Sequence, residues 1–262
     1  MSTIRQRNFL FAAAALLLLT CYGWTLAAPQ AGKNNVVIRG KTQDVYFLPA
    51  TTSGPHRRVL YAPGDGGWRG FGVTIAEKMA SAGYDVYGLD TRKYLQSFAD
   101  ANLGPRDIAG DYRSLGEWAR ESSKDPILLV GWSEGAGLAL AATAEDANRD
   151  IFRGVVAIGT TEQNILAWRW SDTWAEIKKT IPQEPTFASA DYIGRVSPTP
   201  LFMIASAHDE YVTLKSTNAL FARAANPKRL IVIDADDHKY GGHVEELFHA
   251  LSQGLQWVQT NR

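Results

Sequence analysis

One serine lies where the chain could support nucleophilic catalysis on an acyl group. Ser133 is at the centre of a Gly-Trp-Ser-Glu-Gly stretch, directly after the apolar run 127–130. Gly-x-Ser-x-Gly between a strand and a helix is typical of a nucleophile elbow, a sharp turn that exposes the serine hydroxyl. Glycines two residues on either side of the serine allow the strand and the helix to approach closely. The pattern therefore predicts Ser133 as the nucleophile.

A serine hydroxyl is a poor nucleophile without a general base. Of the five histidines, His238 follows the last predicted strand, 230–233, and we expect it to be the base. His243, at the start of the last predicted helix, is the alternative.

The base in turn needs an acid that orients it. Asp209 follows the predicted strand 201–205, and we expect it to take this role. Its alternatives are a helix cap ahead of Thr213 or a salt bridge. Because the carboxyl ends of the strands of an open α/β sheet share one edge, Ser133, Asp209 and His238 can meet there.

Backbone amides are needed for the oxyanion that develops during acyl transfer. The amide of Glu134, directly after the serine, is one predicted donor. The glycine-rich loop 63–67 follows the strand 57–62 and offers the other, with Asp65 as first choice and Gly66 as second. A phosphate-binding role of this loop is not supported, because neither of the usual glycine-rich phosphate motifs is present.

Apolar strands alternate with helices along the chain, which is typical of an α/β fold with a mostly parallel sheet covered on both faces. The expected strands are 36–39, 43–48, 57–62, 84–89, 127–132, 154–159, 201–205 and 230–233, and the expected helices are 71–82, 107–121, 133–147, 213–225 and 244–259. The first two strands suggest a hairpin at one antiparallel edge, preceded by a linker at 32–35. We predict a single domain, 28–262.

One segment, 160–196, interrupts this alternation and carries Trp168, Trp170 and Trp174. Long insertions in α/β domains often cover the site as a lid. These tryptophans either pack the insertion onto the body or line a pocket. In the second interpretation Trp68, Trp132, Trp168 and Trp170 form an aromatic wall for the substrate.

Overall charge argues against electrostatic binding of nucleic acid or of an anionic membrane surface. Lys plus Arg and Asp plus Glu each number 27, so the formal net charge is zero. Asp234, Asp236, Asp237 and His238 could look like metal ligands, but adjacent acids in a loop are more often solvated. We therefore expect neither a metal nor a cofactor.

The N-terminal residues 1–27 have the layout of a secretory signal peptide. Two arginines precede the apolar run 9–19, which is short for a membrane span, and small residues follow near Ala27. Cleavage there predicts an exported protein, periplasmic or secreted, without stable membrane insertion. The alternatives are an uncleaved anchor and a lipoprotein acylated at Cys21. Cleavage also removes the one cysteine, which excludes a cysteine nucleophile.

Together these motifs resemble the α/β-hydrolase superfamily, which has this fold, this elbow and the order Ser–Asp–His. Segment 205–212 resembles its acid loop and segment 233–238 its histidine loop. The Gly-Asp-Gly-Gly-Trp stretch at 64–68 is similar to bacterial VirJ-like proteins, which are exported, and dienelactone-hydrolase-like esterases are the other group that the chain resembles. Trp132 and Glu134 depart from the Tyr and Phe that flank the serine in the VirJ-like group.

The residues thus predict an exported serine hydrolase that cleaves an ester-type bond in a small-molecule or acyl-ester substrate, through an acyl-enzyme. Two alternatives stay open. One is a hydrolase-fold protein that binds a ligand without turnover. The other is an acyltransferase, which passes the acyl group to an acceptor other than water.

Overall fold

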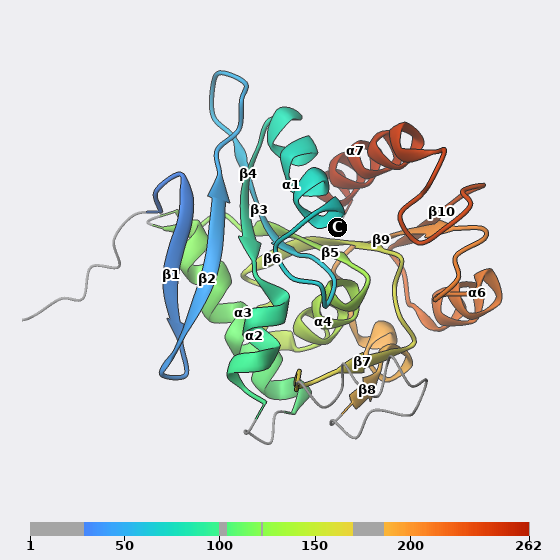
Figure 1. Ribbon diagram of the computed structural model, residues 1–262, viewed down its shortest axis with the longest axis horizontal. Coiled ribbons are helices and arrows are strands. Elements are labelled where there is room, and N and C mark those ends of the chain that lie inside the picture. The colour runs from blue at the N-terminus through green and yellow to red at the C-terminus, as the bar shows by residue number, and fades with distance from the viewer. Residues whose placement is uncertain (1–28, 100–103, 122, 170–185, 262) are drawn as a thin grey trace, which may run out of the picture.

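The structure of the protein is a computed structural model that describes residues 29–99, 104–121, 123–169 and 186–261 (Figure 1). The predicted signal peptide lies outside these residues, as do Trp170 and Trp174. None of the helices in the described ranges is long and apolar enough to cross a membrane.

An eight-stranded sheet forms the centre of the molecule, in the order β1-β2-β4-β3-β5-β6-β9-β10. Its strands are β1 (Gly32–Ile38), β2 (Lys41–Leu48), β3 (Arg57–Ala62), β4 (Tyr84–Leu89), β5 (Ile127–Trp132), β6 (Phe152–Ile158), β9 (Leu201–Ser206) and β10 (Lys228–Ile233). The pairs β1–β2 and β2–β4 are antiparallel, and every other neighbouring pair is parallel. The predicted α/β class with one antiparallel edge is confirmed.

The expected linker at 32–35 is wrong, because these residues belong to β1. Gly32 pairs with Phe47 and Asn35 with Asp44, so the hairpin uses nearly the whole length of β2. Backbone pairing with a full-length partner strand outweighs the polar side chains that made this stretch look like a linker.

Helices cover both faces of the sheet: α1 (Phe71–Ser81), α2 (Thr91–Ser97), α3 (Pro105–Arg120), α4 (Glu134–Thr143), α6 (Leu214–Arg223) and α7 (Val244–Thr260). In Figure 1, α1 and α7 lie above the sheet and α2, α3 and α4 below it. Helix α2 was not predicted. It is short, and it is capped by the Asp90 side chain, which accepts a hydrogen bond from the Lys93 amide (3.1 Å).

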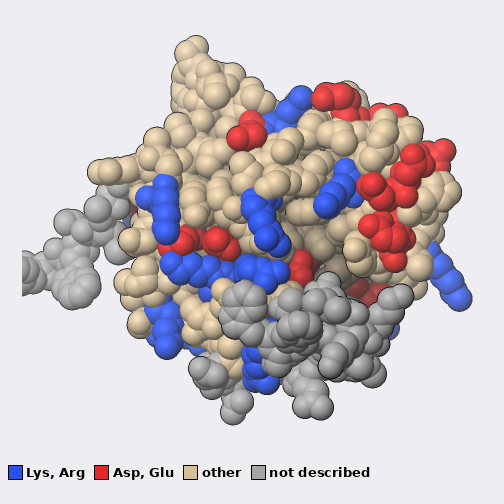
Figure 2. All heavy atoms as spheres, in the orientation of Figure 1, with Lys and Arg blue, Asp and Glu red and all other residues tan. Residues whose placement is uncertain are grey.

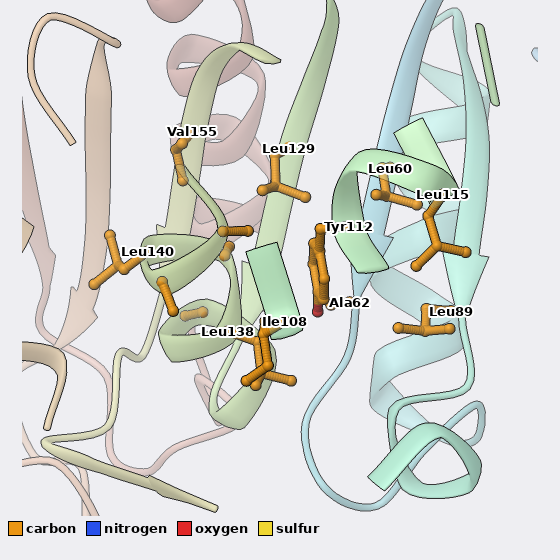
Figure 3. Close-up of a cluster of buried hydrophobic side chains, with 14 of the residues drawn as sticks. Leu60, Ala62, Leu89, Ile108, Tyr112, Leu115, Leu129, Leu138, Leu140 and Val155 are labelled. Atoms are coloured by element: carbon orange, nitrogen blue, oxygen red, sulfur yellow. The ribbon is translucent and has the colours of Figure 1, made fainter. Parts of the chain in front are cut away.

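Two buried clusters fill the space between the sheet and these helices, one on each face. Leu129 of β5 faces the cluster that holds Tyr112 of α3 and Leu138 of α4 (Figure 3), whereas Leu128 and Val130 face the α1 and α7 side. Burial on both faces explains why the parallel strands are apolar without polar alternation.

The insertion contributes a small hairpin, β7 (Gln163–Ile165) and β8 (Thr186–Ala188), followed by the short 3-10 helices η2 (Ser189–Asp191) and η3 (Ile193–Arg195); another, η1 (Asp146–Asn148), follows α4. The hairpin packs against α4 where Asn164 lies over Gly137, and a Cβ at Gly137 would collide with the Asn164 amide. Asn164 also donates to Ser189 Oγ (2.8 Å), which joins the two ends of the insertion.

Candidate active site

The chain turns sharply between β5 and α4, and Ser133 lies at the turn. Its backbone angles are φ 57° and ψ −125°, a conformation that L residues rarely adopt. Glycines make the turn possible, because a Cβ at Gly131 would collide with the Gly135 carbonyl and a Cβ at Gly135 with the Ala62 carbonyl. The Ser133 amide donates to Ile158 O (2.8 Å), which fixes the turn to β6. The structure therefore has the strained strand–turn–helix geometry that the motif predicts.

The predicted base and acid form a buried pair. His238 Nδ1 lies 2.6 Å from Asp209 Oδ2, and the two side chains are only 8% and 1% exposed. A carboxylate can only accept here, so Nδ1 carries the proton of this hydrogen bond, and in the neutral imidazole Nε2 is the basic nitrogen.

The Asp209 carboxylate is stabilised in its charged form. Burial raises its pKa, but the hydrogen bond and charge of His238, together with the amides of Val212 and Tyr211 (both 2.8 Å from Oδ1), lower it below the ordinary value. The acid loop also holds the histidine loop directly, since Glu210 accepts a hydrogen bond from the His238 amide (2.8 Å). Asp209 is therefore an anion fixed beside the imidazole.

The His238 ring is enclosed by other groups of the site. Trp132 stacks on it (centroids 5.6 Å apart), and Tyr211 meets it edge to face (5.4 Å). A Cβ at Gly159 would lie 3.0 Å from the ring, so glycine is needed there for close packing. Nε2 is buried without a hydrogen-bond partner among the described residues. The only basic atom of the ring is thus held available inside the site.

Ser133 and His238 line the same cavity, which has a volume of about 710 Å³. The other lining residues come from the loops after β3, β9 and β10, from the ends of β5, α1, α2 and α4, and from the insertion: Gly64, Asp65, Gly66, Gly67, Arg69, Gly70, Phe71, Arg92, Trp132, Glu134, Thr161, Tyr211 and Lys239. The carboxyl ends of β3, β5, β9 and β10 therefore bring the sequence-predicted residues to one place.

The alternative base, His243, lies apart from this cavity. It precedes α7 and pairs with Glu246 (Nδ1 to Oε1, 2.8 Å), where the hydrogen bond to Glu246 raises its pKa.

His208 pairs with Asp234 on the surface (3.1 Å). Asp237 is used by its own turn, where it accepts from the amides of Lys239 and Gly241. Within the described ranges, no three His, Cys, Asp or Glu side chains are grouped as metal ligands.

The two predicted oxyanion donors flank the serine. Gly64 packs on it, because a Cβ there would lie 3.2 Å from Ser133 Cβ. The next amide, that of Asp65, donates to no acceptor in the described part of the chain, and the turn is closed by Gly67 N–H to Gly64 O (3.0 Å). Glu134 is the first residue of α4, where helix amides and the helix dipole favour negative charge. Gly66, the second choice, also lines the cavity.

Glu134 has a role in the structure that the sequence did not indicate. Its side chain is buried, 6% exposed, and Oε1 accepts a hydrogen bond from the amide of Ile165 in β7 (3.0 Å). The acid beside the serine therefore fastens the insertion to the start of α4.

The aromatic wall is only partly as predicted. Trp132 lines the cavity, but Trp68 stacks on Tyr46 of β2 (4.8 Å, interplanar angle 4°) and lies over Gly88. Trp168 is buried in the core beneath Arg92, and neither Trp68 nor Trp168 lines the cavity. For Trp168 the structure shows the alternative, packing of the insertion onto the body, whereas for Trp68 the prediction is wrong. Both tryptophans contact rings or cations that lie far away in the sequence.

Several cavity residues were missed by sequence reasoning. Tyr211 is 74% exposed at the mouth, and three cations, Arg69, Arg92 and Lys239, line the cavity. Arg69 and Arg92 follow β3 and β4, so the rule that ligands bind at the carboxyl ends of the strands could have found them. Basic side chains lie near the centre of the face in Figure 2, and acidic ones gather to the right, on the side of β10 and α7. Basic and acidic side chains thus gather in different areas of this face, although the net charge of the chain is zero.

The chain is similar in sequence to proteins of bacteria. A profile of the family described as "VirJ: Bacterial virulence protein (VirJ)" matches residues 57–176. An uncharacterized protein of Mycobacterium tuberculosis, Rv2307c, is 25% identical over 224 residues, which are 79% of this chain and 73% of that protein.

Solved structures share the architecture. Est1E from Butyrivibrio proteoclasticus has a TM-score of 0.65 at 15% identity and covers 88% of this chain and 100% of its own. A dienelactone hydrolase from Anabaena variabilis has a TM-score of 0.62 at 18% identity, with 87% and 98% covered. XC6422 from Xanthomonas campestris, described as an a/b serine hydrolase without lid, has a TM-score of 0.61 at 16% identity, with 90% and 99% covered. At these identities the likeness establishes the fold.

Proposed function

We propose that this chain, which has the α/β-hydrolase fold, is an exported serine hydrolase that cleaves an ester bond of a small-molecule or acyl-ester substrate. The observation that carries the proposal is the buried His238–Asp209 pair, whose His238 lines one cavity with Ser133 in its strained elbow. A serine in a strained turn and a histidine that is hydrogen-bonded to a buried carboxylate rarely line one cavity by chance.

The proposed reaction proceeds through an acyl-enzyme. Ser133 Oγ bonds to the substrate carbonyl carbon while its proton passes to His238 Nε2. The carbonyl electrons move onto oxygen, where the amides of Asp65 and Glu134 stabilise the negative charge. The tetrahedral intermediate collapses, the bond to the alcohol breaks, and His238 returns the proton to the leaving oxygen. Water then repeats the sequence and frees the acid and Ser133.

Two further considerations support the details. Proteins of similar structure are described as an esterase domain and as dienelactone hydrolases, which favours an ester over an amide bond. Export is proposed from the signal-like residues 1–27. Fractionation of cells that express the full chain tests export, and recovery of unprocessed protein in the cytoplasm would contradict it.

A panel of p-nitrophenyl esters of increasing acyl length tests the activity. Ser133→Ala should lower kcat by at least about 10³-fold, as expected when a triad member is removed. Ser114→Ala is the matched control, because Ser114 is exposed on α3 and donates to the Gly110 carbonyl of its own helix. A wild-type protein without turnover on the whole panel would contradict the hydrolase and favour ligand binding without catalysis.

A further inference from the structure

We propose that the first part of the insertion, Gln163–Trp168, braces both sides of the oxyanion hole, with Arg92 and Glu134 as the positioning residues. This inference rests on the proposed function. It gives the insertion a role in catalysis that does not require a reacting group. The insertion acts through two contacts, one made by Trp168 and one made by the Ile165 amide.

The first contact runs through Arg92 to the oxyanion loop. Arg92 Nε donates to the carbonyl oxygen of Asp65 (3.0 Å), and its Cβ lies against the position that a Cβ at Gly67 would occupy. The bonded carbonyl belongs to the peptide that joins Asp65 to Gly66. Arg92 therefore fixes the orientation of the peptide next to the proposed Asp65 donor.

Arg92 is itself held by the insertion. Its guanidinium lies over the Trp168 ring, 4.0 Å from the centroid. Trp168 is a fixed platform, because its side chain is buried and its amide donates to Leu95 O of α2 (3.2 Å). A planar guanidinium stacks on an indole face in a way that a lysine ammonium cannot reproduce.

The second contact reaches the other proposed donor. The Ile165 amide donates to Glu134 Oε1 (3.0 Å), and the backbone amide of Glu134 is the donor that follows the serine. The buried Glu134 side chain thus joins the start of α4 to β7. Ile165 and Trp168 are three residues apart, so a single short segment contacts the side chains that hold both donors.

A brace is needed because the loop is intrinsically flexible. Gly64, Gly66 and Gly67 leave it many backbone conformations, and ordering them has an entropic cost. An oxyanion donor must lie within about 2.7–3.1 Å of the developing charge, and a complete loss of one donor lowers kcat by about 10²–10³-fold. Partial loosening of the loop should therefore show in kcat rather than in KM.

Trp168→Leu and Trp168→Phe test the brace with a neutral p-nitrophenyl ester. Leucine keeps apolar volume but has no ring for Arg92, so kcat should fall about 10-fold with KM changed less than about 2-fold. The phenylalanine variant keeps a ring for Arg92, so its kcat should fall clearly less than that of Trp168→Leu. Arg92→Lys, which keeps the charge without the planar stack, should behave like Trp168→Leu.

The Glu134 side has its own pair of variants. Glu134→Gln retains an oxygen that can accept from Ile165, whereas Glu134→Ala does not, so the alanine variant should lose more kcat. Arg195 provides a control within the insertion: its guanidinium lies over Tyr192 (4.9 Å) and does not line the cavity, and Arg195→Gln should leave kcat unchanged.

Hydrogen exchange of the amides of residues 64–69, of which Gly67 and Arg69 donate hydrogen bonds within the loop, supplies a readout that does not depend on turnover. The brace predicts faster exchange in Trp168→Leu than in wild type, with Trp168→Phe between them. Unchanged exchange, or equal kcat in the two variants, would overturn the brace. A rise in KM confined to a carboxylate-bearing ester in Arg92→Lys would overturn it in favour of direct substrate binding. Absence of turnover in wild type would instead contradict the proposed function.

Discussion

Two histidine–carboxylate pairs, whose histidines lie five residues apart in the chain, differ mainly in their surroundings. His238 and Asp209 are 2.6 Å apart with side chains 8% and 1% exposed, whereas His243 and Glu246 are 2.8 Å apart and 33% and 64% exposed. The geometry of the hydrogen bond is nearly the same. The His238–Asp209 pair differs from the other in that it is buried, has aromatic rings packed on its imidazole, and shares a cavity with Ser133.

The comparison shows that pairing alone does not make a catalytic base. In water an ion pair is screened and stabilises a protein by about 0–1 kcal/mol. In the buried pair, Asp209 also accepts hydrogen bonds from two backbone amides, and the imidazole contacts the rings of Trp132 and Tyr211. The ring can then act in one orientation, with one nitrogen directed by the acid. The following predictions test this contrast.

Replacement of the two histidines should give the largest difference. His238→Ala should lower kcat by about 10⁶-fold or to the detection limit, since removal of the base disables the serine. His243→Ala should change kcat by less than about 2-fold. Steady-state kinetics on a short-chain ester measures both, and comparable losses in the two variants would refute the assignment of the base.

Replacement of the two carboxylates should give the next largest difference. Asp209→Asn should lower kcat on the order of 10⁴-fold, because the amide no longer holds the required tautomer of His238. Glu246→Gln is the matched control and should retain wild-type kcat. If Asp209→Asn kept full activity, the acid would have to be another residue.

The contributions of the two pairs to stability should change with pH in opposite directions. The buried pair is considered first. The pKa of Asp209 is lowered in the folded protein, so its contribution to stability is present above about pH 4 and is lost as pH falls through the lowered value. The difference in unfolding free energy between wild type and Asp209→Asn should therefore shrink between pH 5 and pH 3. Urea titrations measure it, and a constant difference would contradict the charged carboxylate.

The exposed pair should give the smallest effect. The pKa of His243 is raised by the hydrogen bond to Glu246, so its contribution is present below about pH 6.5 and is lost as pH rises through the raised value. His243→Ala should destabilise the protein slightly at pH 6 and less at pH 9. A larger loss at pH 9 would mean that the pair does not stabilise the charged imidazole.

The fold and the common location of Ser133, Asp209 and His238 could be predicted from the sequence for one reason. Parallel strands end at one edge, so Ser133, Asp209 and His238 could be assigned to that edge from the strand pattern alone. The strands β3, β4 and β5 agree with their predicted bounds because their apolar runs are buried on both faces.

The errors arose where tertiary contacts decide. Helix α2 is too short for a clear periodic pattern and depends on its Asp90 cap. Trp68 and Trp168 were placed in the cavity by residue type, yet their partners, Tyr46 and Arg92, come from other parts of the chain. Likewise, the reason for an acid at Glu134 becomes visible only with the path of the insertion.

The central claim is that Ser133 is the nucleophile of a working triad. A fluorophosphonate probe reacts covalently with an activated serine, and intact mass with peptide mapping locates the adduct. The account predicts one adduct, on Ser133, that is lost in Ser133→Ala and strongly slowed in His238→Ala, with His243→Ala labelled like wild type. Labelling of wild type no faster than of Ser133→Ala would contradict it.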